Sequence, residues 1–406
     1  MKALLEQHLR GDRILWVVVL LLAVVSLLSV YSGGAWLIWR TPGGGGRLLF
    51  KHALMLVSGG AIMYMASRVR YTVYSKLSQL LILITAGLLL VTLLFGSNVN
   101  GASRWLAVPG LGITFQTSDL AKVVLLVYLA RVLSKRHDEP WNFRDVLVQI
   151  ALPIGVICGL ILPANFSTAA LLGITCLVLL FIARVPLKFI GGLVLMAIGA
   201  FVVLLVVAKA DPDLLPRLRT WEGRFDRWIS NDPQTTAEDR DANFQANNAK
   251  IAIAVGGLMP NGPGTGTSRN YMPHSESDMI YALIIEEYGS LIGGLGLLLL
   301  YLILLYRSSR IARRCEKPFG SYATIGLALS LVLTALMNMA VSVGMVPVTG
   351  QPLPLVSMGG TSIWFACLAV GIIISVSRSV YDTPAPTSPG KHARTSSPDG
   401  PSVAIA

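Results

Sequence analysis

Asp119 and Lys122 are opposite charges three positions apart at the start of a long apolar run, in the segment Gln116-Thr-Ser-Asp-Leu-Ala-Lys122. Carrying a charge into the hydrocarbon of a membrane costs roughly 3 kcal/mol or more, so each ionisable residue there is a candidate for function. Residues three apart on a helix share a face and can pair. We therefore expect either a structural ion pair that fixes the helix or a ligand site in which Lys122 meets an anion.

Asp278 directly precedes another apolar run, which places a carboxylate at the outer surface of the membrane. A base at the membrane surface suits chemistry on a lipid-linked substrate. The segment Ser275-Glu-Ser-Asp278 also fits a helix capping box, with Ser275 as N-cap and Asp278 at N3. Both interpretations of Asp278 stand on the sequence.

Two further features flank Asp278. Glu286 and Glu287 enter the same apolar run, and because consecutive helical residues point in different directions, at most one faces a given cavity. Packing against a polar partner is as good an explanation as catalysis. Upstream, the glycine-rich segment 256–268 lacks the Gly-Lys-Ser/Thr of a phosphate loop and is better explained by turns. Its backbone amides could still meet a diphosphate.

Apolar runs that recur along the whole chain must position these residues. Of the 406 residues, 54% are hydrophobic and only 13% are charged, which excludes a soluble enzyme with one anchor. A helical crossing takes about 20 apolar residues, and the runs do not alternate as β-barrel strands would. We predict an all-α integral membrane protein with about ten transmembrane helices. The predicted spans are 14–32, 50–66, 77–95, 119–134, 147–163, 167–184, 187–208, 279–305, 321–346 and 361–378.

Basic residues indicate the orientation of these spans. Most lie in loops on one side, whereas the short loops on the other side hold only Arg40, Arg47 and Arg104. The positive-inside rule then makes both termini cytoplasmic and explains the net charge of +12 without a nucleic-acid partner. The predicted parts are a cytoplasmic N-terminus (1–13), a ten-helix membrane domain (14–380) with a large extracytoplasmic loop (209–278) between helices 7 and 8, and a disordered cytoplasmic tail (381–406).

Three groups of motifs carry a resemblance to a known family. The first is Asn338, followed by Gly344-Met-Val-Pro347-Val-Thr-Gly350 and Pro354-Leu-Val-Ser357-Met-Gly-Gly-Thr-Ser362. The second is Asn100-Gly-Ala-Ser-Arg104-Trp105 with Phe115-Gln-Thr-Ser-Asp-Leu-Ala-Lys122. The third runs from Phe244-Gln245 through Gly256-Gly257 and Pro273 to Asp278 and Glu286-Glu287-Tyr-Gly289. Together, over about residues 10–380, they resemble the SEDS family, the membrane enzymes of the FtsW, RodA and SpoVE type.

The chain departs from the family pattern at several positions. Asp119 stands where Glu is usual, and Asn165 replaces an Asp after the fifth predicted span. Because the family's Asp at 278 and Lys at 122 remain, we expect the departures to affect specificity more than activity. The other departures are His274, Glu276, Gln351 and Met358.

The resemblance implies a peptidoglycan glycosyltransferase. Such an enzyme polymerises lipid II, an undecaprenyl-diphosphate-linked disaccharide-peptide, on the outer face of the cytoplasmic (inner) membrane. Its implied partners are a class B penicillin-binding transpeptidase and other divisome membrane proteins. The motifs are more similar to the FtsW type, the division members, than to the RodA type of elongation polymerase, which implies a place at the septum. A lipid II flippase and a non-catalytic scaffold are the alternatives.

The resemblance also implies roles for single residues. Asp278 would be the catalytic base for an acceptor hydroxyl that attacks the sugar carbon bearing the diphosphate, which gives a β-1,4 linkage with inversion. Diphosphate is a good leaving group, so one carboxylate suffices, unlike the pair of a glycosidase. A divalent cation such as Mg²⁺ or Mn²⁺ could assist, although the sequence has no dedicated ligand cluster for a metal. The implied substrate-binding residues are Lys122, Arg104, Asp119, Gln245 and Ser357, with Arg217 or Arg219 as weaker cations for the diphosphate.

Overall fold

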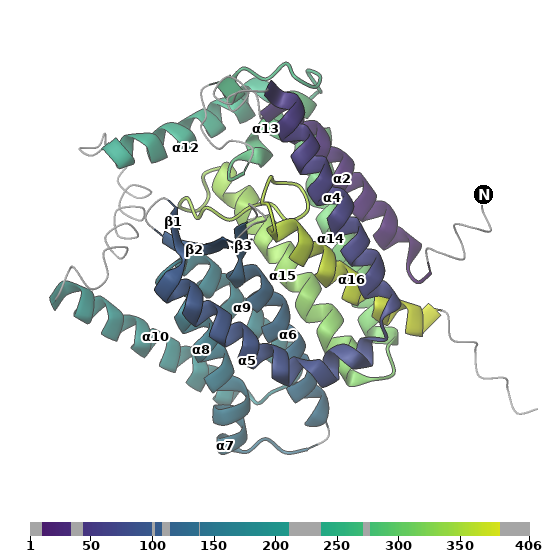
Figure 1. The fold of residues 1–406 in the computed structure, drawn as a ribbon, viewed down its shortest axis with the longest axis vertical. Helices are drawn as coiled ribbons and strands as arrows, with labels where there is room; N and C mark the ends of the chain where they lie inside the picture. The colour runs from purple at the N-terminus through teal and green to yellow at the C-terminus, as the bar shows by residue number, and fades with distance from the viewer. Residues whose placement is uncertain are drawn as a thin grey trace, which may run out of the picture.

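The computed structural model describes most of the chain as one helical bundle (Figure 1). The described residues are 10–33, 44–99, 102–107, 114–137, 139–210, 237–270 and 277–381. The predicted disordered tail and most of the predicted N-terminal segment lie outside them, although Tyr381 still belongs to the last helix.

A helix or a stack of short helices covers each of the ten predicted spans. Two spans are composite, since π-helical turns interrupt them: α7 (Phe143–Asp145), η1 (Val146–Ala151) and α8 (Leu152–Ile161), and later α13 (Ile280–Tyr288), η3 (Gly289–Leu295) and α14 (Gly296–Arg314). The other helices are α2 (Arg13–Gly33), α4 (Gly44–Arg68), α5 (Tyr71–Phe95), α6 (Thr117–Lys135), α9 (Phe166–Ile182), α10 (Leu187–Ala210), α15 (Pro318–Ser342) and α16 (Ser362–Tyr381).

Eight of these segments are long and apolar enough to cross a membrane. The prediction of an all-α integral membrane protein is therefore confirmed. The two segments outside that set are α9, which has only 17 residues, and α6, whose sequence includes Asp119, Lys122, Arg131 and Lys135. A count of ten crossings remains a prediction.

The centre of the bundle is built by α6, α15 and α16, whose leucines, isoleucines and alanines form one buried cluster. Close helix packing needs small residues. At Gly371 of α16, for example, a Cβ would lie 2.7 Å from both the Met63 carbonyl oxygen and the Ala66 Cβ of α4. By contrast, none of the residues Leu187–Val206 of α10 is buried, and this helix lies at the edge of the bundle in Figure 1.

A small antiparallel sheet precedes α6. It consists of β1 (Ser97–Val99), β2 (Ala102–Ala107) and β3 (Thr114–Gln116), in that order. Trp105 of β2 pairs with Gln116, the last residue before α6. The strands lie at the same end of the bundle as α12 and α13 (Figure 1), so the start of α6 is held at that end.

The predicted large loop, 209–278, contains regular structure. Helix α10 continues to Ala210, and α12 (Ala237–Gly256) is a 20-residue helix that packs on α13 and buries Ala249 and Ala252. A short 3₁₀ turn, η2 (Ser268–Asn270), follows. The description of this region as a loop therefore missed a helix, because α12 is not a continuous apolar run like the spans and begins with the charged residues Glu238, Asp239, Arg240 and Asp241.

The start of α2 and the end of α16 meet at the opposite end of the bundle, where Asp12 is buried. Its backbone N–H donates to Ser377 Oγ at 3.0 Å, and its Oδ1 accepts the N–H of Ile14 in the first turn of α2. Its Oδ2 accepts from Arg307 Nε at 2.9 Å and Nη2 at 2.5 Å. Two donors of Arg307 thus converge on one carboxylate oxygen, and charge-assisted hydrogen bonds are among the strongest side-chain contacts. Together with the Ser377 contact, they join the start of α2 to α14 and α16.

We expect Arg307→Ala to lower the free energy of unfolding by about 3 kcal/mol, because it leaves the Asp12 carboxylate buried without its partner. Thermal unfolding in detergent measures the change. Arg313→Ala, on the exposed face of the same helix, is the matched control and should change stability by less than about 0.5 kcal/mol. Equal losses for the two variants would contradict this assignment.

Candidate functional site

Asp278 lies in a turn two residues before α13, which begins at Ile280. The predicted capping box is therefore wrong, since the helix starts after Asp278 and its N-cap is Met279. The carboxylate is half-buried rather than enclosed. Its Oδ1 accepts the Ser277 hydroxyl at 2.9 Å, and a Cβ at Gly350, whose φ is +64°, would lie 3.6 Å from its Oδ2. The chain at Gly350 thus passes beside the second carboxylate oxygen.

Asn338 and Ser357, both from the C-terminal motif region 338–362 (the signature segment), hold the backbone of this turn. Asn338 Nδ2 donates to the Asp278 carbonyl at 2.9 Å and to the Gln351 carbonyl at 2.7 Å. Ser357 Oγ donates to the Ser277 carbonyl at 2.6 Å and accepts the N–H of Leu353 at 2.8 Å. Ser357 is 1% exposed, so this geometry favours a positioning role over the direct substrate contact that the motif implies.

We expect Ser357→Ala to lower the free energy of unfolding by about 1–2 kcal/mol, because the Ser277 carbonyl and the Leu353 N–H lose a buried partner. Activity should fall further than this stability loss explains, since the turn that carries Asp278 is released. Thermal unfolding measures the stability loss, and turnover at a temperature where the variant is fully folded measures the loss of activity. Normal turnover in a destabilised variant would limit Ser357 to a structural role.

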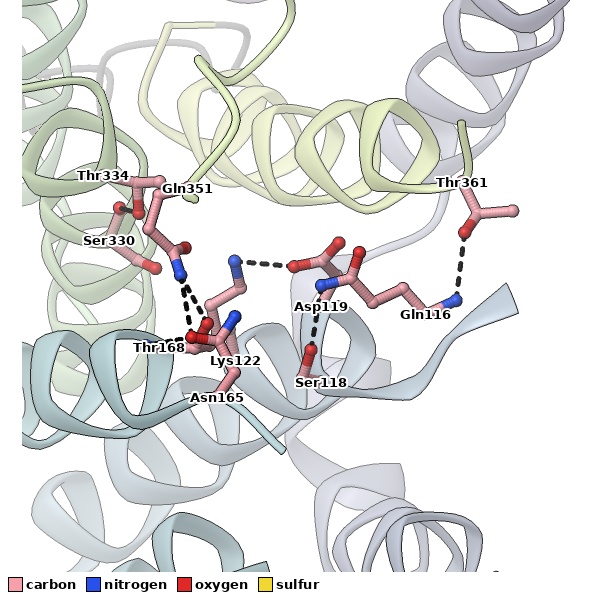
Figure 2. Close-up of polar contacts among 10 residues, drawn as sticks. All are labelled: Gln116, Ser118, Asp119, Lys122, Asn165, Thr168, Ser330, Thr334, Gln351 and Thr361. Atoms are coloured by element: carbon pink, nitrogen blue, oxygen red, sulfur yellow. Dashed lines mark hydrogen bonds and ion pairs between the residues drawn. The ribbon is translucent and has the colours of Figure 1, made fainter. Parts of the chain in front are cut away.

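Lys122 and Asp119 form the ion pair that their spacing predicts (Figure 2). Lys122 Nζ lies 2.7 Å from Asp119 Oδ1, and the Asp119 side chain is 3% exposed. Both residues line a pocket with Ser330 and Thr334 of α15 and Pro352 of the signature segment. The Lys122 side chain is 16% exposed and lines this pocket, so a ligand in the pocket would contact it.

Gln351 connects the start of α9 with the Asp278 turn. Its backbone carbonyl accepts from Asn338, as described above, and its side-chain Nε2 donates to Thr168 Oγ1 at 2.6 Å and to Asn165 Oδ1 at 3.4 Å. Figure 2 shows these groups beside Lys122. Asn165 is also the N-cap of α9, where its Oδ1 accepts the N–H of Thr168. The two departures from the family pattern, at 165 and 351, are thus partners of one another.

The beginning of α6 is tied to the same signature segment. The Gln116 N–H donates to Thr361 Oγ1 at 3.1 Å, and the Gln116 side chain donates to Ser118 Oγ at 3.1 Å (Figure 2). Residues 350–361 therefore contact both the turn of Asp278 and the helix of Lys122. Sequence patterns do not reveal this bridging position.

The structure is less informative about the other predicted site residues. Arg104 lies in β2, but its side chain is outside the described part. Gln245 is half-buried on α12. Arg217 and Arg219 fall among the residues that are not described. Within the described ranges no group of three His, Cys, Asp or Glu side chains could hold a metal ion.

Membrane-spanning helices around buried polar contacts define a polytopic α-helical membrane protein. The chain belongs to the FtsW/RodA/SpoVE family, whose model, described as "Cell cycle protein", matches residues 12–382. It is 32% identical over 370 residues to the probable peptidoglycan glycosyltransferase FtsW of Geobacter sp. (strain M18), covering 90% of this chain and 96% of that one. It is 30% identical to the stage V sporulation protein E of Bacillus subtilis (strain 168), covering 90% and 97%.

Solved structures share the fold. A chain of a peptidoglycan synthase complex that coordinates polymerization and crosslinking matches with a TM-score of 0.70 at 24% identity, covering 92% of this chain and 99% of that one. The crystal structure of RodA, the rod shape determining protein of Thermus thermophilus, matches with a TM-score of 0.64 at 22% identity, covering 91% and 98%. The family match and the relatives confirm the resemblance inferred from the motifs, and the solved structures confirm the fold.

Proposed function

We propose that the protein is a peptidoglycan glycosyltransferase that polymerises lipid II into β-1,4 glycan strands with inversion at the sugar carbon. The observation that carries the proposal is the position of residues 350–361, which join a half-buried carboxylate, Asp278, to a pocket lined by an accessible cation, Lys122. The relatives named peptidoglycan glycosyltransferase FtsW support the same activity.

In this mechanism Asp278 accepts the proton of the acceptor sugar hydroxyl as that oxygen attacks the carbon that carries the lipid diphosphate. The diphosphate leaves with its electron pair, so no protonated acid is required. Lys122 and Arg104 neutralise the charge that develops on the leaving group, where a cation is worth most in a site of low dielectric constant. Asp119 holds Lys122, and Gln245 contacts substrate. A divalent Mg²⁺ or Mn²⁺ ion would add charge at the diphosphate without a dedicated protein cluster.

The protein acts, in this proposal, in septal wall synthesis during cell division. Both termini are cytoplasmic and α12 lies outside, where lipid II is consumed. The solved peptidoglycan synthase complex supports a class B penicillin-binding transpeptidase as partner, alongside other divisome membrane proteins. Imaging of a fluorescent fusion tests the assignment: septal bands support division, and signal along the lateral wall favours a RodA-type role in elongation.

One reconstitution tests the activity itself. The purified protein, with and without its transpeptidase partner, is incubated with lipid II, and products are separated by gel electrophoresis. Glycan strands support the proposal. No polymer in either mixture, combined with transfer of labelled lipid II across liposomes, would replace it with the flippase alternative. Absence of both activities would favour the scaffold.

A further inference from the structure

Glu286 is a buried carboxylate with an unusual set of donors. Its Oε1 accepts the N–H groups of Thr267 at 2.9 Å and Ser268 at 3.1 Å, and also the Ser268 hydroxyl at 3.1 Å. Glu286 itself is 2% exposed. Hydrogen bonds to an ionised acceptor are roughly twice as strong as neutral ones. The amides that the sequence offered for a diphosphate are thus occupied by a carboxylate of the protein itself.

The glycine-rich segment is shaped to fit this carboxylate. A Cβ at Gly266 would lie 3.0 Å from Glu286 Oε2 and 3.3 Å from Glu287 Oε1. At the other end of the segment, a Cβ at Gly256 would collide with the backbone of Ile285. Glycines at both positions therefore serve close approach to α13, a use that spacing alone did not show.

Backbone contacts continue along the same surface. The N–H groups of Asn261 and Gly262 each donate to the Glu287 carbonyl at 2.9 Å, and Asn261 Nδ2 donates to the Glu286 carbonyl at 3.0 Å. These bonds satisfy carbonyls at the end of α13 that have no partner within the helix. Segment 256–270 therefore packs along the end of α13, and the Glu286 carboxylate is the charged group that holds it there.

Ser32 of α2 contacts both Glu287 of α13 and Arg269 of the same segment. The Ser32 hydroxyl donates to Glu287 Oε1 and accepts from Arg269 Nη1 at 3.0 Å. The two adjacent glutamates thus face different partners, as their positions on a helix require, and both partners are polar groups of the protein. The sequence left packing and catalysis open for this pair, and these contacts favour packing.

Both ends of this segment lead to predicted site residues. It follows α12, which carries Gln245, and Ser268 stands ten positions before Asp278. From this we infer that Glu286 is a positioning residue for the transferase site: its carboxylate fixes segment 256–270, and with it the end of α12, on α13, the helix that begins two residues after Asp278. The inference rests on the proposed function for its activity readout, but the attachment itself can be measured without it.

The test compares Glu286→Ala with Glu286→Gln in the full-length protein. Hydrogen exchange followed by mass spectrometry should show faster exchange of the 256–270 peptide in the Ala variant, because the Thr267 and Ser268 amides lose their acceptor. Turnover on lipid II should fall by about 100-fold with little change in KM, since small displacements of a reacting group have effects of this size. The Gln variant keeps an acceptor oxygen and should recover both properties in part.

Thr265→Ala is the matched control, because its exposed side chain bonds only within the same loop and does not contact Glu286. It should retain wild-type exchange and turnover.

Fast exchange with normal turnover in Glu286→Ala would overturn the positioning role. So would a Gln variant with wild-type exchange and the turnover of the Ala variant, since the charge would then act on the reaction itself. If the wild-type protein forms no polymer at all, the proposed function fails, while unchanged exchange in Glu286→Ala overturns the inference independently.

Discussion

Replacing Asp278 with asparagine should lower the rate of lipid II polymerisation by about 1,000-fold and leave the protein folded. Positioned general bases contribute roughly 10²–10⁴ to a rate, and an amide cannot take the proton of the acceptor hydroxyl. Asparagine has the shape of aspartate, and its oxygen can still accept from the Ser277 hydroxyl. The contacts of the Asp278 carbonyl with Asn338 are made by the backbone and are unaffected. Initial rates and thermal unfolding of the same preparation measure the two effects.

Ser277→Ala provides the control for this prediction. It removes the hydroxyl bonded to Asp278 Oδ1 but keeps the carboxylate and the Ser277 carbonyl that Ser357 holds. We expect the rate of lipid II polymerisation to fall by less than about tenfold, because one ordinary hydrogen bond contributes about 1 kcal/mol. If Asp278→Asn polymerises lipid II within a few fold of wild type, Asp278 is not the base.

The membrane spans were predictable because each one is a continuous apolar stretch of the sequence. Apolar runs of about 20 residues have few alternatives to a helix in lipid. Helix α12 was not predictable in this way, because it is stabilised by its packing on α13 rather than by a strong pattern of its own. The start of α13 shows the same limit. Ser275-Glu-Ser-Asp278 is a valid cap by local rules, yet the helix begins later, at Ile280, where contacts from Asn338 and Ser357 fix the preceding turn.

The sequence identifies candidate site residues, because charged groups are costly within a membrane. It does not identify the residues that they contact. The pairing of Asp119 with Lys122 follows from helical spacing alone. The contact of Asn165 with Gln351 joins positions 186 residues apart, and no local rule relates them. The carboxylate of Glu286 likewise meets amides 18 and 19 positions upstream. Sequence indicated which residues are unusual, and the tertiary structure decides what each one contacts.

The pair Asp119–Lys122 can be tested for function separately from stability. Lys122→Met leaves the 3% exposed Asp119 carboxylate unpaired, so we expect it to lower the free energy of unfolding by about 3–5 kcal/mol. The double variant Asp119→Leu with Lys122→Met removes both charges and keeps similar volumes, and such replacements are often neutral for stability. Thermal unfolding of the two variants should therefore differ clearly, with the double variant close to wild type.

Turnover of that double variant then decides what Lys122 does. If Lys122 meets the diphosphate, the well-folded double variant should still polymerise lipid II about 100-fold more slowly than wild type, the effect of losing one preorganised group that stabilises developing charge. Loss of charge at the pocket should also raise KM, because lipid II is anionic. A double variant with wild-type turnover would instead make the pair a structural device that fixes α6. In that case Lys122 would not be required as a cation for the diphosphate, and Arg104 would be the residue that binds it.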